Sequence, residues 1–184
     1  MKLHRMVWLL VLVNQAYAQS GWKQSSLNSP MGDNSGIVLN AKQVPVGSSA
    51  IPQETGLAIQ CTKKDHLEAV LATGLVLNSS GSVNDENHRG AIGGMFSKHA
   101  NQSLSPVRVR FDQQKIRREE WVMGASPSNL FVQNPKKFVD ELIKDQVHEV
   151  LIEVHPVGGD PVVFKFDVAG LAEYKTKLRD SCGY

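Results

Sequence analysis

Alternating apolar and polar positions dominate the second half of the chain. Val107-Arg-Val-Arg-Phe111 has the two-residue period of a strand with one buried face. Residues 147–154 and 161–166 have the same character and flank the turn-forming Pro156-Val-Gly-Gly-Asp160, which predicts a hairpin. A further hairpin is expected from residues 120–123 and 129–132. This half of the chain therefore predicts antiparallel β-structure.

The first half contains shorter apolar runs between polar segments. Residues 37–39 predict a short strand, and residues 57–61 and 67–71 predict a hairpin around the polar turn at 62–65. From about 78 to 105 the chain is rich in Ser, Gly and Asn and has no clear period, which predicts a flexible excursion.

Two segments have helical spacing. Asn134 and Pro135 are suited to the cap and first turn of a helix, which would carry Phe138, Val139, Leu142 and Ile143 on one side. Asp167 is suited to cap a second helix, whose inward stripe would be Leu171, Tyr174, Leu178 and Cys182. The predicted fold class is mainly β (α+β): one antiparallel, β-sandwich-like domain with two short helices.

The N-terminus has the layout of a secretory signal peptide. Lys2 and Arg5 precede the apolar residues 6–13, and the small residues Ala16 and Ala18 follow. We expect cleavage after Ala18 and a single β-rich periplasmic domain at 19–184. The alternative is a buried N-terminal strand or helix. An eight-residue apolar run spans only about 12 Å as a helix, so no membrane span is expected.

Composition and charge narrow the classes of partner. Of the 184 residues, 41% are hydrophobic and 21% are charged, as in ordinary globular domains. The formal net charge is +2, but loss of Lys2 and Arg5 would leave a neutral chain. Local basic clusters are followed by acidic residues, so no nucleic-acid partner is expected.

The two cysteines of the chain, Cys61 and Cys182, predict a disulfide. An even number of cysteines in an exported protein is typical of disulfide pairing. The bridge would close a loop of about 120 residues and tie the C-terminus to the first half of the domain.

Motifs for catalysis are not recognisable in the sequence. His148 and His155 are separated by an odd number of positions along one predicted strand, so they would point to opposite faces. Gly124-Ala-Ser126 begins like a nucleophile elbow but lacks the final glycine. We therefore expect no catalytic residues, no metal site and no cofactor.

An ordered set of residues across the predicted mature domain resembles a known family, the TagO/VasI-like periplasmic proteins associated with type VI secretion systems. The resemblance lies in Gly21-Trp22, Asn28-Ser-Pro-Met-Gly-Asp33, Leu57-Ala-Ile-Gln-Cys61, Val107-Arg-Val-Arg-Phe-Asp112, Trp121, Asn129-Leu-Phe131, Pro135, Phe138, Phe164-Lys-Phe-Asp167, Gly170-Leu171 and Cys182-Gly183. It implies a non-enzymatic periplasmic accessory protein of a secretion apparatus that contacts protein subunits or peptidoglycan. The candidate interaction or structural residues are Trp22, Arg110, Asp112, Trp121, Phe131, Phe166 and Asp167.

Two other functions stay open at the level of sequence. A small neutral domain with one disulfide also suits a periplasmic inhibitor or immunity-type protein, possibly phage-borne, directed at a cell-wall enzyme or toxin. An envelope hydrolase is the third hypothesis, and it lacks a recognisable nucleophile or metal set. The partner's identity and the oligomeric state do not follow from the sequence.

Overall fold

The computed structural model describes residues 21–27, 36–44, 46, 55–61, 66–82, 103–144 and 146–183. Its elements are β1 Trp22–Leu27, β2 Gly36–Val44, β3 Gly56–Cys61, β4 Leu67–Ala72, β5 Gly81–Ser82, β6 Ser103–Phe111, β7 Arg117–Met123, β8 Asn129–Phe131, α1 Pro135–Lys144, β9 Glu149–Val154, β10 Val162–Asp167, the 3-10 turn η2 Leu171–Tyr174 and α2 Lys175–Cys182. Within these ranges no helix combines the length and apolar character that a membrane crossing needs. The predicted signal peptide and most of the predicted excursion, residues 83–102, lie outside the described residues.

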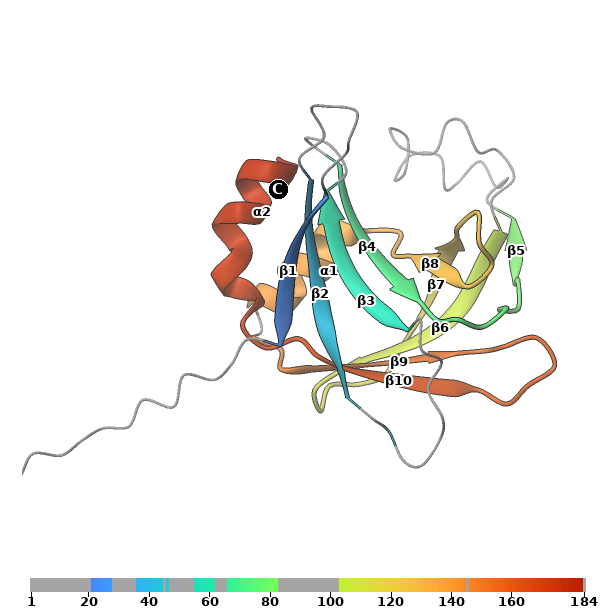
Figure 1. The fold of residues 1–184 in the computed structure, drawn as a ribbon. Coiled ribbons are helices and arrows are strands. Elements are labelled where there is room, and N and C mark those ends of the chain that lie inside the picture. The colour runs from blue at the N-terminus through green and yellow to red at the C-terminus, as the bar shows by residue number, and fades with distance from the viewer. Residues whose placement is uncertain are drawn as a thin grey trace, which may run out of the picture.

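The described strands form a closed antiparallel barrel (Figure 1). Eight strands follow one another around it in the order β2, β10, β9, β6, β7, β8, β4 and β3, and β3 pairs with β2 again. The expectation of a sandwich is therefore wrong, although the β-rich class is confirmed. Strand periodicity indicates which side chains face inward, but it does not reveal that the first and last strands of a sheet meet.

Closure depends on β2, which has three partners. One edge of β2 pairs Ile37–Asn40 with β3. The other edge pairs Gly36–Ala41 with β1 and then Lys42–Val44 with β10. Strand β1 therefore lies outside the barrel and continues the line of β10 along the same edge of β2.

Side chains fill the barrel, as an eight-stranded barrel allows. Alternate residues of β9 point inward, and Val150, Ile152 and Val154 are fully buried. On β3, Leu57, Ile59 and Cys61 are buried in the same alternation. The predicted hairpins β3–β4, β7–β8 and β9–β10 are all present.

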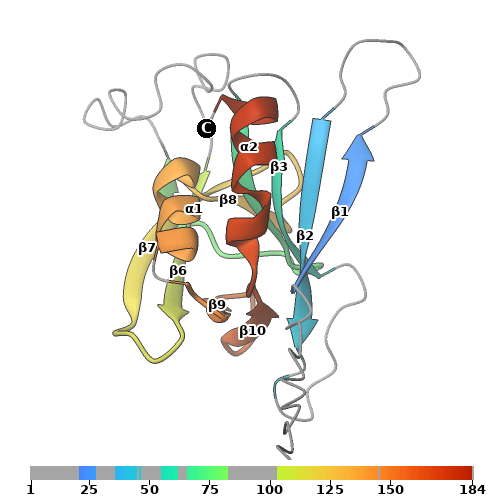
Figure 2. The same cartoon turned by 90° about the vertical axis from the view of Figure 1, so that its left-hand side faces the viewer.

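Both helices lie on the same side of the barrel (Figure 2). Helix α1 begins as predicted, because Asn134 Oδ1 accepts a hydrogen bond from the Lys137 backbone N–H at 3.0 Å. Its Phe138 is 3% exposed and packs edge-on against Phe111 and Trp121, with ring centroids 5.6 and 6.0 Å apart. Helix α1 thus anchors an aromatic cluster at the barrel wall.

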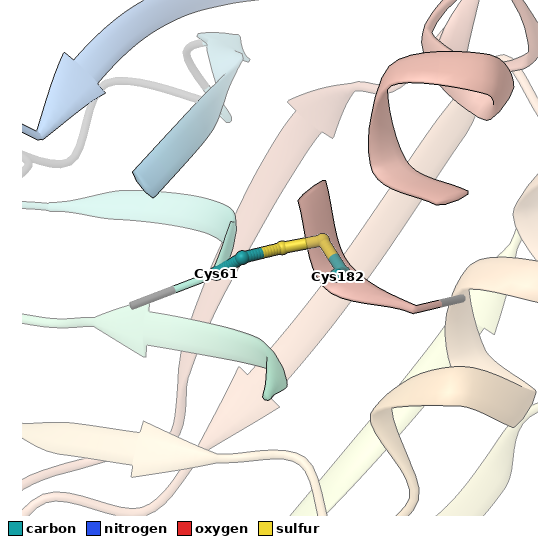
Figure 3. Close-up of a disulfide and its surroundings, with 2 residues drawn as sticks. All are labelled: Cys61 and Cys182. Atoms are coloured by element: carbon teal, nitrogen blue, oxygen red, sulfur yellow. A yellow bond between two sulfur atoms is a disulfide. The ribbon is translucent and has the colours of Figure 1, made fainter. Parts of the chain in front are cut away.

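The C-terminal helix is joined to the barrel by the predicted disulfide between Cys61 and Cys182 (Figure 3). The two Cα atoms are 5.5 Å apart, and both residues are buried. Leu171, Leu178 and Cys182 face the core as predicted, whereas Tyr174 is partly buried. The predicted disulfide thereby ties the end of α2 to the end of β3.

Asp167 does not cap this helix, contrary to prediction. It is the last residue of β10, and its Oδ1 accepts a hydrogen bond from the Ala169 backbone N–H. Gly170, with φ 78°, intervenes and starts the 3-10 turn η2, and α2 begins only at Lys175. The predicted single helix is a 3-10 turn followed by a shorter α-helix.

Several strand boundaries differ from the prediction. Strand β1 was not predicted, because its sequence WKQSSL is mostly polar. Strand β6 already begins at Ser103, inside the predicted excursion, and β7 begins at Arg117, before the start of the strand predicted at residues 120–123. Polar residues are tolerated in these places because one face of each strand is accessible to solvent.

Candidate functional site

The junction between β1 and β10 contains three of the candidate residues, Trp22, Phe166 and Asp167. Trp22 is 3% exposed, and its indole Nε1 donates a hydrogen bond to the carbonyl oxygen of Val168 at 2.9 Å. Phe166 is fully buried. Gly21 lies so close to Asp167 that a Cβ at this position would overlap the Asp167 carbonyl group. These residues hold the fold together and present little surface to a partner.

Asp112 has a structural position between β6 and β9. Its carboxylate accepts hydrogen bonds from the backbone N–H groups of His148 and Glu149, at 3.1 and 2.8 Å. The Asp112 backbone N–H donates to the Glu149 carbonyl oxygen at 2.9 Å. The residue adopts φ 43°, a left-handed conformation that Asp and Asn accept more readily than most residues. Asp112 therefore fixes the end of β6 against the start of β9.

Trp121 and Phe131 also belong to the packed part of the molecule. Trp121 is 1% exposed, so its ring offers no free face for stacking on a ligand. Phe131 is half-buried and packs against Gly124, where a Cβ would approach the Phe131 ring to 2.8 Å. Trp121 is therefore not placed to contact a partner, and Phe131 has a packing role beside Gly124.

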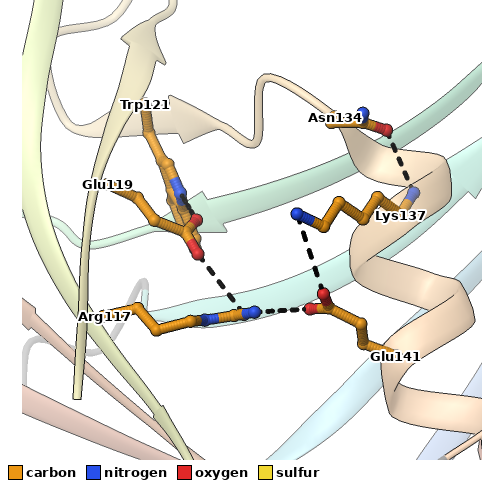
Figure 4. Close-up of polar contacts among 6 residues, drawn as sticks. All are labelled: Arg117, Glu119, Trp121, Asn134, Lys137 and Glu141. Carbon is orange, nitrogen blue, oxygen red and sulfur yellow. Dashed lines mark hydrogen bonds and ion pairs between the residues drawn. The ribbon is translucent and has the colours of Figure 1, made fainter. Parts of the chain in front are cut away.

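Charged residues of β7 and α1 form a closed network (Figure 4). Arg117 donates from Nη1 to Glu141 Oε2 at 2.8 Å and lies 3.3 Å from Glu119 Oε1. The indole Nε1 of Trp121 donates to Glu119 Oε2 at 2.9 Å, and Lys137 Nζ lies 4.0 Å from Glu141 Oε1. A hollow of about 270 Å³ lies beside this network. The two cationic and two anionic side chains balance in formal charge. Because Arg117 and Glu141 belong to different elements, their ion pair joins β7 to α1.

The outer surface of β6 and β7 carries charges that are less well balanced. We define the arginine face as the outward side chains of Arg108, Arg110 and Arg118. Arg108 lies directly opposite Arg118 of β7 on one side and Glu153 of β9 on the other. Arg110 lies two residues further along β6, on the same face because side chains alternate along a strand.

One carboxylate serves the opposed pair of arginines. Arg108 Nη1 donates to both carboxylate oxygens of Glu153, at 2.9 and 3.0 Å. Arg118 is exposed and has no hydrogen bond or ion pair within the described part of the chain. The Nε atoms of Arg108 and Arg110 are buried without a hydrogen-bond partner there. This face therefore holds guanidinium groups with unused donor capacity.

A groove of about 510 Å³ opens on the arginine face. Its lining includes Pro106, Arg108, Arg118, Glu120, Glu153 and His155. The volume falls within the range of sites that bind small molecules or single side chains of a partner. His155 Nε2 lies 3.6 Å from Glu153 Oε1, and Glu120 accepts a hydrogen bond from the Ser80 hydroxyl at 3.1 Å. The groove combines cationic and anionic walls with the apolar ring of Pro106.

An exposed apolar pair lies where the segment after His155 is hydrogen-bonded to the segment between β4 and β5. Val76 and Val157 are each 59% exposed, and the Val157 backbone N–H donates to the Val76 carbonyl oxygen at 2.9 Å. A neighbouring hydrogen bond joins the Asn78 N–H to the His155 carbonyl oxygen, also at 2.9 Å. Arginine is enriched at protein interfaces relative to the rest of the surface, so the arginine face is compatible with a protein-binding surface.

The arginine face is the candidate functional site, and the sequence located it only in part. Arg110 was a candidate, whereas Arg108, Arg118, Glu153 and His155 were not. The alternation in Val107-Arg-Val-Arg-Phe111 places Arg108 and Arg110 on one face, which is a usable signal. The opposition of Arg108 and Arg118 depends on the register of β6 and β7, which the sequence does not specify.

The arrangement is suited to anion binding. Arginine presents a planar fork of donors that matches carboxylate and phosphate groups. Among the described residues, no cluster of three or more His, Cys, Asp or Glu side chains could hold a metal ion. Comparisons of the chain with protein-family models, curated proteins and solved structures found no match.

Proposed function

We propose that the protein is an exported, non-enzymatic accessory protein of a secretion apparatus in the cell envelope, and that it works by binding a protein partner through the arginine face. The observation that carries the binding role is the opposed pair Arg108 and Arg118. Among the described residues, Glu153 is the one carboxylate that binds either of these two guanidinium groups. Arg118 has no ion-pair partner among the described residues, and arginine is enriched at protein interfaces and at their energetic hot spots.

Two further features support the export and envelope part of the proposal. The N-terminal sequence has the layout of a signal peptide. The buried disulfide is of the kind that persists in oxidising compartments. The secretion apparatus itself rests on the resemblance to TagO/VasI-like proteins.

Photo-crosslinking in the cell tests this function. A photoreactive residue replaces Glu120, which lines the groove, in the full-length protein at native expression. The matched control carries the same residue at Arg179, which is 65% exposed on α2. Captured material is identified by mass spectrometry, with a search for both proteins and peptidoglycan fragments.

The expected result is capture of identified secretion-machine subunits from position 120 and not from position 179. Capture of a single cell-wall enzyme or toxin from position 120 would establish the inhibitor class and overturn the accessory function. Peptidoglycan fragments would replace the protein partner with the wall polymer. Equal capture from both positions would show that the arginine face is not the binding surface.

A further inference from the structure

We propose that Arg108 and Arg118 form a clamp for one side-chain carboxylate, Asp or Glu, on an extended segment of the partner protein. This inference rests on the proposed function and assigns the chemistry that the arginine face recognises. It also predicts that the unoccupied clamp lowers the free energy of unfolding of the barrel. Arg118 should therefore favour binding of the partner and disfavour folding of the free protein.

The first step is the opposition of two like charges. Directly opposed residues on neighbouring antiparallel strands have Cβ atoms about 5 Å apart, and like charges in such a pair are destabilising. Arg108 and Arg118 occupy this arrangement next to the last residue pair of the β6–β7 ladder. An anion between the two guanidinium groups removes the repulsion and satisfies donors on both.

The second step is that Glu153 does not complete the pair. Its carboxylate is bound to Arg108 through Nη1 and also faces His155. Glu120, the acidic residue on the outward face of β7, accepts a hydrogen bond from the Ser80 hydroxyl. Arg118 is thus the one cation of the groove left without a partner among the described residues.

The third step concerns which anion fits. Glu120 and Glu153 line the same groove as the arginines, so a polyphosphate chain or an anionic membrane would place repeated negative charges beside them. A single carboxylate on a peptide avoids this conflict. The apolar ring of Pro106 and the exposed Val76 and Val157 offer contacts for the rest of a peptide segment.

The clamp predicts two opposite effects of one substitution. Arg118→Glu places a carboxylate opposite Arg108, which satisfies the clamp from within the chain. The variant is expected to melt at a temperature equal to or above that of the unchanged protein, because a like-charge pair becomes an opposite-charge pair. It is also expected to lose carboxylate binding.

The test uses NMR titration of the isotope-labelled mature protein, and the probe is a capped hexapeptide that carries a single glutamate among uncharged residues. The variants are Arg118→Ala, Arg118→Glu and the control Arg179→Ala, and each is also melted without ligand. We expect amide shifts in β6, β7 and β9, about tenfold weaker binding in Arg118→Ala, no binding in Arg118→Glu and no change in Arg179→Ala. Equal binding by the unchanged protein and Arg118→Glu would overturn the clamp.

Inorganic phosphate is titrated in parallel to separate the two sources of anion. The clamp for a peptide carboxylate requires the peptide to bind more tightly than phosphate at equal ionic strength, and tighter phosphate binding overturns it. Arg118→Glu is also combined with the crosslinker at position 120. If the partner is still captured, the binding role of the face holds and the clamp is wrong. If capture is lost only in Arg118→Glu, both are supported.

Discussion

Gly21 is a residue whose lack of a side chain is required by its neighbours. It lies against the backbone of Asp167, its N–H donates to the Ala169 carbonyl oxygen at 3.0 Å, and its own carbonyl accepts from the Lys42 N–H. We expect Gly21→Ala to reduce the free energy of unfolding by about 1–3 kcal/mol, because the new methyl group must push β1 away from β10.

Gly56→Ala is the matched control, since no atom lies within 4 Å of a Cβ built there. Urea unfolding of both variants measures the difference. Similar stability of Gly21→Ala and Gly56→Ala would show that the junction of β1 and β10 is looser than described.

At this scale the sequence indicated important residues better than it indicated their roles. Trp22, Trp121, Phe166, Asp112 and Asp167 were candidates for either interaction or structure, and the barrel uses all five in packing or backbone hydrogen bonds. Aromatic and acidic residues that stand out in a strand pattern are often needed internally. The binding candidates are instead arginines, whose meaning depends on what lies across the neighbouring strand.

At the scale of elements, the ion pair between Arg117 and Glu141 links β7 to α1. Their side chains are 35% and 25% exposed, so solvent screens the pair in part. A double-mutant cycle with Arg117→Ala and Glu141→Ala is expected to give a coupling energy of about 0.5–1 kcal/mol that falls as salt is added.

Lys137 supplies the comparison in the same network. It is 69% exposed and 4.0 Å from Glu141, so its coupling to Glu141 should stay within a few tenths of a kcal/mol. Chemical unfolding at low and high salt measures both cycles. A coupling for Lys137 as large as that for Arg117 would contradict the geometry described for α1 and β7.

Elements with strong local signals were predictable. The cap at Asn134 and the turn at residues 156–160 each carry their own information, and both occur where predicted. Strand β1 carries no such signal because the four residues after Trp22 are polar, and its place depends on pairing with β2. Gly170 likewise converts the start of the expected last helix into a 3-10 turn.

At the scale of the whole molecule, the disulfide joins residues 121 positions apart. Cys61→Ser and Cys182→Ser are each expected to reduce the free energy of unfolding by an amount on the order of 5 kcal/mol, because the unfolded chain regains the freedom of a long loop. The double variant should cost little more than either single one, since both remove the same bond.

Thermal melting with thiol titration of the native protein provides the measurement. Clearly additive losses in the double variant would mean that the two side chains act independently, and titratable thiols in the native protein would mean that the bond is absent.

Closure of the barrel was beyond the reach of sequence patterns. The class, the hairpins and the cysteine pair follow from local features or from parity. The choice between sandwich and barrel depends on whether β2 and β10 meet, and only Lys42–Val44 and Lys165–Asp167 make that contact. The candidate site could not be predicted for the same reason. Its residues come together only through the pairing registers of β6, β7 and β9, which the sequence does not specify.

The disulfide divides the chain into two parts with different freedom. Everything from β4 to α2 lies inside the covalent ring from Cys61 to Cys182, whereas β1 and β2 precede it. Three residue pairs join β2 to β10, compared with six between β10 and β9. Amide hydrogen exchange should therefore be faster in the Lys42–Val44 part of β2, which pairs with β10, than in β9. Equal protection of these two segments would contradict this expectation.

If β2 separated from the barrel, the edges of β3 and β10 would lose their shared partner strand. Both edges would then be free to pair with a strand of the same sequence as β2. Another molecule's β2 carries that same sequence, so it fits the gap as well as the original strand does. Strand exchange between copies is the expected route of self-association at high concentration. The ring would remain closed in each copy throughout, because β2 lies outside the segment that the disulfide closes.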